Sequence, residues 1–179
     1  MRPRALSFNN DSTMPPTHRI VPCLWFADQA EEAAKFYTAI FKNSRINTIT
    51  RYSAVGFETH HRPAGSVMTV NFELDGEPFT GLNGGPVFEF NEAVSLQVYC
   101  DTQEEIDYYW EKLSAGGDPK AQVCGWLKDR FGLSWQIVPS MLDDWFKDEK
   151  SPGAQRAMAA MLQMKKLDIA ALKRAHDAT

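Results

Sequence analysis

The sequence has few of the residues on which disulfide frameworks and thiolate metal sites depend. It contains three cysteines, Cys23, Cys100 and Cys124, which are odd in number, widely spaced and free of any CxxC pattern. This spacing excludes a disulfide framework and the common cysteine-type zinc sites. Unpaired cysteines are typical of proteins that work in a reducing compartment, so a cytoplasmic location is predicted.

Long apolar runs and clusters of basic residues are missing as well. No stretch approaches the roughly 20 apolar residues that a membrane span requires. The 19 lysines and arginines are outweighed by 23 acidic residues, and no basic stripe is available to bind phosphates. We therefore expect a soluble protein without a nucleic-acid or membrane partner. Residues 1–17 lack the apolar core of a signal peptide and are predicted to form a flexible extension, with Met1 or Met14 as the start.

The sequence does contain a strand-helix pattern near its beginning. The apolar run at 20–26 predicts a strand, and residues 28–41 place apolar side chains at helical spacing. Asp28 is the expected N-cap of that helix, with Glu31 as its capping-box partner. Three further strands are predicted at 45–52, 66–74 and 77–83. The first half thus reads β-α-β-β-β.

The same pattern returns 73 positions later, where Asp101 matches Asp28 and Tyr109 matches Phe36. This period is too long for a solenoid repeat and indicates two fused copies of one module. The prediction is an α+β fold with modules at 18–90 and 91–140, the second more compact, followed by helices in 141–179. We expect the methionine face of that tail to pack on its own sheet or on a partner subunit.

Three segments together resemble PhnB-like proteins of the glyoxalase/bleomycin-resistance (vicinal oxygen chelate) class, many of which are described as demethylubiquinone 3-methyltransferase-like. The segments are LWFADQAEEAAKFY (24–37), LNGGP (82–86) and CGWLKDRFGLSWQIVP (124–139). The resemblance implies that residues 18–140 form one domain, in which two β-α-β-β-β modules curl into a half-barrel around a cavity. It also implies a homodimer.

Metal-dependent members of this class place one ligand on the first and one on the last strand of each module. In this sequence those positions fall on Pro22, on Asn83 or its neighbour Leu82, on Ser95 and on Gln136. Proline has no donor side chain, and serine and asparagine are poor ligands for a divalent transition metal. Only Gln136 remains, so neither a metal ion nor another cofactor is expected.

Aromatic residues are dense on the strands that would line the cavity. Together with nearby polar side chains, they suggest an apolar pocket in which a few polar groups orient the ligand. The candidate ligand-binding residues are Trp25, Asn83, Cys124, Trp126, Trp135 and Gln136. Cys124 is better explained as a small buried residue, and His60 and His61 as part of a solvated loop. Glu73 and Asp129 are possible general bases, but surface charges are the commoner outcome, and no catalytic residue is assigned.

The leading hypothesis is a protein that binds a small, partly apolar ligand without the usual divalent metal site. Whether it is also an enzyme stays open. The alternatives are a metal-assisted isomerase, lyase or dioxygenase that uses Gln136 with Glu73 or His61, and a resistance protein that sequesters a drug. Methyl transfer is not expected, because Gly84-Gly85-Pro86 is not followed by the helix that a nucleotide-type glycine turn requires.

Overall fold

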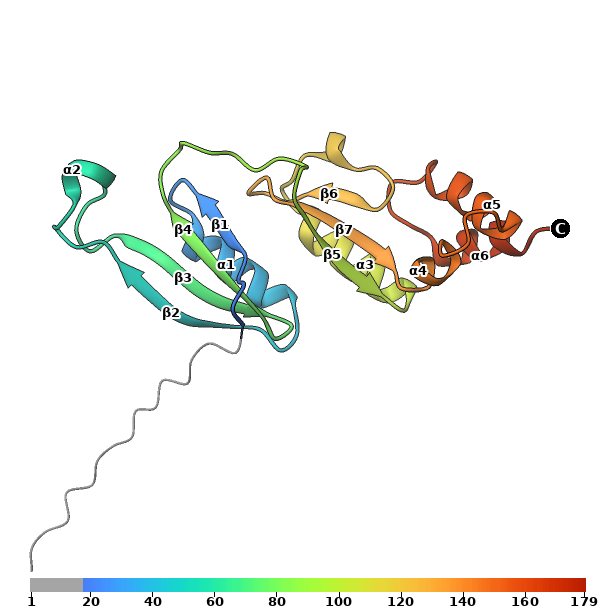
Figure 1. Cartoon of the computed structure of the whole chain (residues 1–179), viewed down its shortest axis with the longest axis horizontal. Helices are drawn as coiled ribbons and strands as arrows, with labels where there is room; N and C mark the ends of the chain where they lie inside the picture. Colours follow the sequence, from blue (N-terminus) through green and yellow to red (C-terminus); the bar gives the residue numbers. More distant parts are fainter. Residues whose placement is uncertain (1–17) are drawn as a thin grey trace, which may run out of the picture.

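The structure is a computed structural model that describes residues 18–179, so the predicted extension 1–17 and the choice between Met1 and Met14 lie outside the described residues. The chain forms two β-sheets, each covered by a helix, and a group of C-terminal helices. Figure 1 shows the two sheet modules side by side along the long axis, with the C-terminal helices beyond the second module. The predicted α+β class is confirmed.

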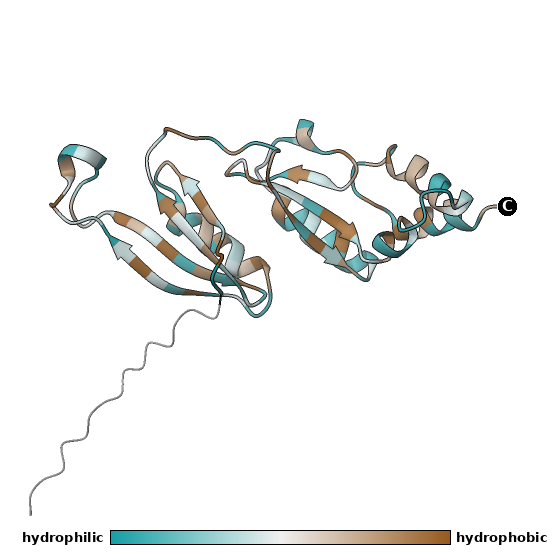
Figure 2. Cartoon of the chain, viewed as in Figure 1, coloured by the Kyte–Doolittle hydropathy of each residue, from teal (hydrophilic) through white to brown (hydrophobic). Residues whose placement is uncertain are grey.

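The first module is the predicted β-α-β-β-β unit, with one short helix added in the loop after its second strand. Its strand order is β1-β4-β3-β2, with β1 parallel to β4 and the other neighbours antiparallel. Figure 2 shows hydrophobic and polar residues alternating along these strands, because one face packs on α1. The elements are β1 (Cys23–Phe26), α1 (Ala30–Ile40), β2 (Arg45–Arg51), α2 (Phe57–His60), β3 (Val67–Leu74) and β4 (Glu77–Asn83).

The second module repeats this arrangement with one strand fewer. Its order is β5-β7-β6, and the parallel β5-β7 pair corresponds to the β1-β4 pair of the first module. The expected fourth strand is replaced by a 3-10 turn and one isolated bridge between Val123 and Trp126, because the connection is short. Neither sheet closes into a barrel. The elements are β5 (Ser95–Cys100), α3 (Gln103–Ser114), η1 (Pro119–Ala121), β6 (Trp126–Lys128) and β7 (Ser134–Pro139).

The two module helices begin in different ways. Helix α3 has a capping box, in which Thr102 and Glu105 bond each other's backbone N–H groups. Helix α1 begins at Ala30, and the side chain of its N-cap Gln29 makes no capping bond, so the predicted Asp28 cap is wrong. Instead the side-chain oxygen of Asn83, on β4, accepts the Ala30 N–H at 2.8 Å. The sheet therefore fixes the start of α1.

The C-terminal segment folds into three helices, α4 (Met141–Trp145), α5 (Pro152–Met161) and α6 (Ile169–Asp177). Its buried residues Leu142, Leu167 and Leu172 form a second, smaller core, against which Met161 and the β7 residue Val138 pack. Met158 stays 36% exposed, so the methionine face is only partly used for packing within the chain. Among residues 18–179, no helix combines the length and apolar character needed to cross a membrane.

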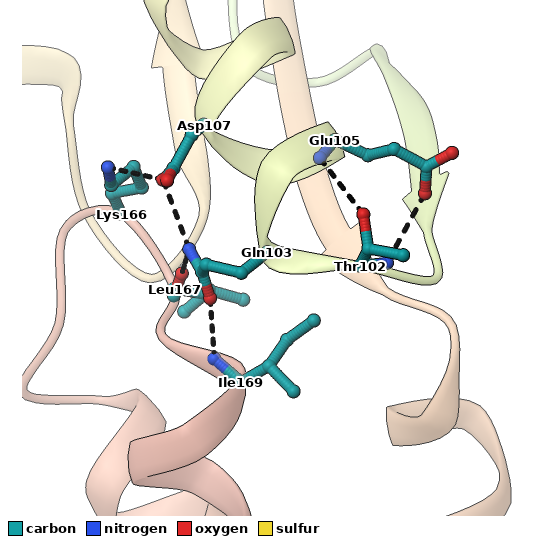
Figure 3. Close-up of polar contacts among 7 residues, drawn as sticks. All are labelled: Thr102, Gln103, Glu105, Asp107, Lys166, Leu167 and Ile169. Atoms are coloured by element: carbon teal, nitrogen blue, oxygen red, sulfur yellow. Dashed lines mark hydrogen bonds and ion pairs between the residues drawn. The ribbon is translucent and has the colours of Figure 1, made fainter.

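The C-terminal segment is attached to α3 through polar contacts, which Figure 3 shows beside the capping box. The Gln103 side chain donates to the Leu167 carbonyl at 3.2 Å and accepts the Ile169 N–H at 2.9 Å. Lys166 forms an ion pair with Asp107 at 2.5 Å. Gln103, at the start of α3, thus fixes the backbone on both sides of the point where α6 begins.

The two modules share one core, and the carboxylate of Asp129 lies within it. Asp129 is 2% exposed and follows β6, and its Oδ2 accepts the Tyr37 hydroxyl at 2.7 Å and the Trp135 indole N–H at 2.9 Å. Its Oδ1 accepts the backbone N–H groups of Phe131 and Leu133 at 2.8 and 3.1 Å. Burial raises the pKa of Asp129, and the four donors oppose that rise.

Loss of the Tyr37 hydroxyl should therefore destabilise the whole domain. We expect Tyr37→Phe to lower the free energy of unfolding by about 1.5–3 kcal/mol, because a buried carboxylate loses a donor that water cannot replace. Tyr99→Phe is the matched control, since the Tyr99 hydroxyl bonds Gln97 on an exposed surface and should change stability by less than about 0.5 kcal/mol. Urea denaturation measures both variants. Equal stabilities for the two would contradict the assigned role of Tyr37.

Candidate functional site

Each sheet has one face that no helix of its own module covers. On the first sheet, α1 packs against β3 and β4, where Val70, Phe72 and Leu74 are buried. Strand residues alternate between faces, so Asn71, Glu73 and their neighbours lie on the opposite side. We call this side the open face of the first sheet. The equivalent side of the second sheet, opposite α3, is its open face.

The open face of the first sheet is concave and polar. It contains a hollow of about 820 Å³, whose lining includes His18, Arg45, Asn47, Asn71, Glu73 and Thr80. Glu73 forms an ion pair with Arg45 at 2.7 Å and accepts a hydrogen bond from Asn47 at 2.8 Å. Thr80 donates to Asn71 at 3.0 Å. Glu73 is therefore held in an ion pair, which makes it a poor general base.

The open face of the second sheet carries a chain of neutral hydrogen bonds. Gln136 donates to Ser95 at 2.8 Å and accepts from Gln97 at 3.3 Å, while Tyr99 donates to Gln97 at 3.1 Å. Trp126 is the strand partner of Gln136 on β6 and is half-buried. Amide, hydroxyl and indole groups on one surface can bind a ligand that offers both polar and apolar contacts.

The open faces contain several of the positions that the resemblance to the glyoxalase class assigns to metal ligands. Ser95 and Gln136 lie together, and their side chains bond each other. Leu82 lies on the open face of the first sheet, because its neighbour Asn83 turns to α1. Pro22 contributes a backbone carbonyl that accepts the Thr80 N–H. Within residues 18–179, no three His, Cys, Asp or Glu side chains gather as a metal-ion site would need.

Three of the predicted ligand-binding residues occupy the open faces. Gln136 and Trp126 lie together on the second sheet. Trp25 lies on the first sheet, where its indole N–H donates to the Gly85 carbonyl at 2.8 Å and its ring meets Phe88 edge-on at 5.0 Å. The structure does not bring Trp25 and Trp126 into one pocket wall within a single chain, because they belong to separate sheets.

The other three predicted residues lie elsewhere. Asn83 is 4% exposed and caps α1, and Trp135 is 2% exposed in the shared core. Cys124 lies in the tight turn before β6 with φ 50, and its N–H donates to the Met164 carbonyl at 2.8 Å. That turn therefore connects the second sheet to the C-terminal segment. The Asn83 side chain is engaged in the helix cap, so it does not face a ligand on the open face.

The paired histidines lie in the loop around α2. The His60 ring packs against Tyr52 at 4.6 Å with a tilt of 36°, and its two nitrogens bond the Val55 carbonyl and the Arg62 N–H. His61 has a positive φ of 52 as the residue that ends α2. These bonds within the loop explain His60 without a metal ion.

Sequence reasoning missed two features. The sequence suggests a general base or a surface charge at Asp129, yet this residue is buried between the modules. The turn residue Gly132, three positions later, is the available signal. The second feature is a groove between the modules. It is formed by residues that are far apart in the chain, and no local pattern indicates it.

Comparisons with known proteins agree with this fold. The profile of a family described as 3-demethylubiquinone-9 3-methyltransferase matches residues 18–138. A solved structure of a PhnB protein from Bacillus cereus, described as a 3-demethylubiquinone-9 3-methyltransferase, is 35% identical with a TM-score of 0.58, and the match covers 69% of this chain and 100% of that one. No curated protein matches.

Two further structures share the fold at lower identity. Protein PA1353 from Pseudomonas aeruginosa is 19% identical with a TM-score of 0.51, over 69% of this chain and 98% of that one. The fosfomycin resistance protein FosX from Mesorhizobium loti is 13% identical with a TM-score of 0.51, over 74% of this chain and 98% of that one. These likenesses concern the fold alone.

The cysteines differ in their expected reactivity. Burial, and after it the charges of Glu105 and Asp101, raise the pKa of the Cys100 thiol to about 12. At pH 8 only on the order of one thiol in ten thousand is then ionised, and the thiolate is the reactive form. We expect Cys100 to resist a disulfide reagent in native protein and to react after unfolding in guanidinium chloride. Cys100→Ser, which removes only the slow thiol, is the control. Three equally fast thiols in native protein would contradict this assignment.

Proposed function

Because the chain belongs to the family described as 3-demethylubiquinone-9 3-methyltransferase, in the glyoxalase-fold class, we propose that it binds a small, partly apolar ligand without the divalent metal centre of that class. The observation that carries the proposal is the Ser95–Gln136 hydrogen bond of 2.8 Å. Two positions at which the class would bind a metal are occupied by neutral side chains that satisfy each other. The proposed contacts are Gln136 and Trp126 on one open face and Trp25 on the other.

The residues do not fit a resident divalent ion. Transition metals favour imidazole, thiolate and carboxylate donors, and catalytic zinc sites use three such protein ligands. The corresponding positions here offer a proline, a leucine, a hydroxyl and a neutral amide. A metal-assisted isomerase, lyase or dioxygenase would need Glu73 or His61 to join Gln136. Glu73 is already paired with Arg45, and His61 lies in the α2 loop. No metal-dependent step is therefore assigned.

The family description names a methyl transfer, but the residues support ligand binding better. The common route to S-adenosylmethionine uses a doubly wound parallel sheet and a glycine turn that opens a helix. Here Gly84 and Gly85 pack against Trp25 instead. A Cβ added at Gly84 would lie 2.0 Å from the Trp25 ring, and Gly85 has φ 95. The packing of Trp25 accounts for Gly84 and the positive φ accounts for Gly85, and the chain continues into the linker between the modules.

A second copy of the chain is the proposed partner. The hollow on the first sheet is lined by that sheet and the residues before β1, so a single chain leaves it open on one side. Strands β1 and β5 are edge strands with one unpaired side each. Another copy could cover both features, and a homodimer is the usual state of glyoxalase-fold relatives. The three free cysteines suit the reducing cytoplasm, where we place the protein.

Metal analysis tests the proposal. Protein purified without chelator should contain far less than one divalent ion per chain, and added zinc, manganese or nickel should leave its melting temperature unchanged. A specific site filled at one hundred times its Kd would add about 2.7 kcal/mol of stability. A partly apolar metabolite found in the same thermal screen should bind at least about tenfold more weakly to Gln136→Ala, a loss of about 1.4 kcal/mol.

Gln155→Ala is the control, since Gln155 lies on α5 and away from both open faces. A stoichiometric ion that Gln136→Ala removes and Gln155→Ala retains would refute the proposal. Binding of a planar drug without chemical conversion would show that the protein acts by sequestering its ligand.

A further inference from the structure

A second concave surface lies between the modules, apart from the hollow on the first sheet. We call it the inter-module groove. It has a volume of about 400 Å³, within the range of roughly 300–1,000 Å³ that is usual for small-molecule sites. The first module contributes the end of α1 and the β3–β4 turn, and the second contributes β5, α3 and β7. Its lining residues are Phe41, Leu74, Asp75, Glu77, Phe79, Leu96, Gln97, Val98, Tyr99, Tyr109 and Trp135.

The floor of this groove is aromatic and held in place. The Phe41 ring stacks on Tyr109 at 5.1 Å and on Trp135 at 5.4 Å, with interplanar angles of 24° and 23°. The Trp135 indole is fixed by its bond to the buried Asp129 carboxylate. Trp135 is only 2% exposed and supports this stack, so the half-buried Phe41 and Tyr109 are the rings that a ligand can contact without first ordering the protein.

The rim of the groove is negatively charged. Asp75 and Glu77 lie at the β3–β4 turn, and within residues 18–179 neither side chain has a hydrogen-bond or ion-pair partner. Among the residues that the structure describes, no lysine, arginine or histidine lines the groove. Burial, and after it the charges of Cys100 and Asp75, raise the pKa of the Tyr109 hydroxyl, so the field of Asp75 reaches the aromatic floor.

We propose that the inter-module groove binds a planar aromatic cation. The rings of the ligand would pack against the half-buried Phe41 and Tyr109, and the positive charge would be paired with Asp75 and Glu77. A cation near an aromatic face gains about 0.5–2 kcal/mol, and the two carboxylates add Coulomb attraction. An aromatic anion of similar size would be repelled by the same rim. The groove shares Gln97 and Tyr99 with the hydrogen-bond chain of the second sheet, but its lining contains none of the proposed ligand contacts Trp25, Trp126 and Gln136.

Fluorescence anisotropy of proflavine, a planar cation, tests this assignment in the full chain. The double variant Asp75→Asn, Glu77→Gln should weaken proflavine binding at least about tenfold, which corresponds to about 1.4 kcal/mol. Asn adopts the positive φ of 49 found at Asp75 more readily than most residues, so the turn should be kept. The anionic dye 1-anilinonaphthalene-8-sulfonate should bind more weakly than proflavine to the wild type.

The matched control is the double variant Glu58→Gln, Glu104→Gln. It removes the same two charges from exposed helix positions outside the groove and should bind proflavine as the wild type does. A second variant, Phe41→Leu, should also weaken binding, and circular dichroism checks that it folds. Equal affinities of the two charge variants, equal affinities for the two dyes, or no proflavine binding would each overturn the proposal.

Discussion

A single buried carboxylate joins the two halves of this protein. Asp129 accepts two bonds from the turn that it begins, one from Trp135 in its own module and one from Tyr37 in the other. An ionisable group in such a place is costly unless every lone pair is used, and here four donors use them. The turn that Asp129 shapes also carries Phe131, whose ring packs on Phe36 at 5.7 Å and on Tyr37 at 5.9 Å.

The contact between Tyr37 and Asp129 decides which surfaces remain for ligands. Because α1 packs against the β6–β7 turn and β7, the helix-covered faces of both sheets meet in one core, and the open faces remain for ligands or a second chain. The same contact fixes Trp135 beneath the inter-module groove. The two surfaces therefore differ in character. The open face of the second sheet is polar and nearly neutral, whereas the inter-module groove is aromatic and acidic.

Much of the fold could be predicted from local patterns. The repeat at 73 positions predicted two modules, and the structure forms two sheets in which the parallel β5-β7 pair corresponds to β1-β4. The cap of α1 could not be found in this way. Asp28 has the right chemistry, but Asn83 reaches Ala30 from a strand 53 residues away. Such a bond depends on the finished sheet and leaves no local signal.

The candidate site could be predicted only in part. Gln136 and Trp135 are adjacent on β7, and so are Leu82 and Asn83 on β4, so neither pair could lie on one pocket wall. Strand alternation was therefore an available signal that separates the core residues Trp135 and Asn83 from the open-face residues. The groove was beyond the reach of sequence, because Phe41, Asp75 and Tyr109 meet only when the modules dock.

Hydrogen exchange measured across a urea series tests most directly whether the two modules form one unit. The account predicts that the slowest amides of β3 and of β7 open with the same free energy and the same urea dependence, because both sheets share the core around Asp129. If β3 opened at low urea while β7 stayed protected, the modules would be independent units, and the central role given to Asp129 would be contradicted.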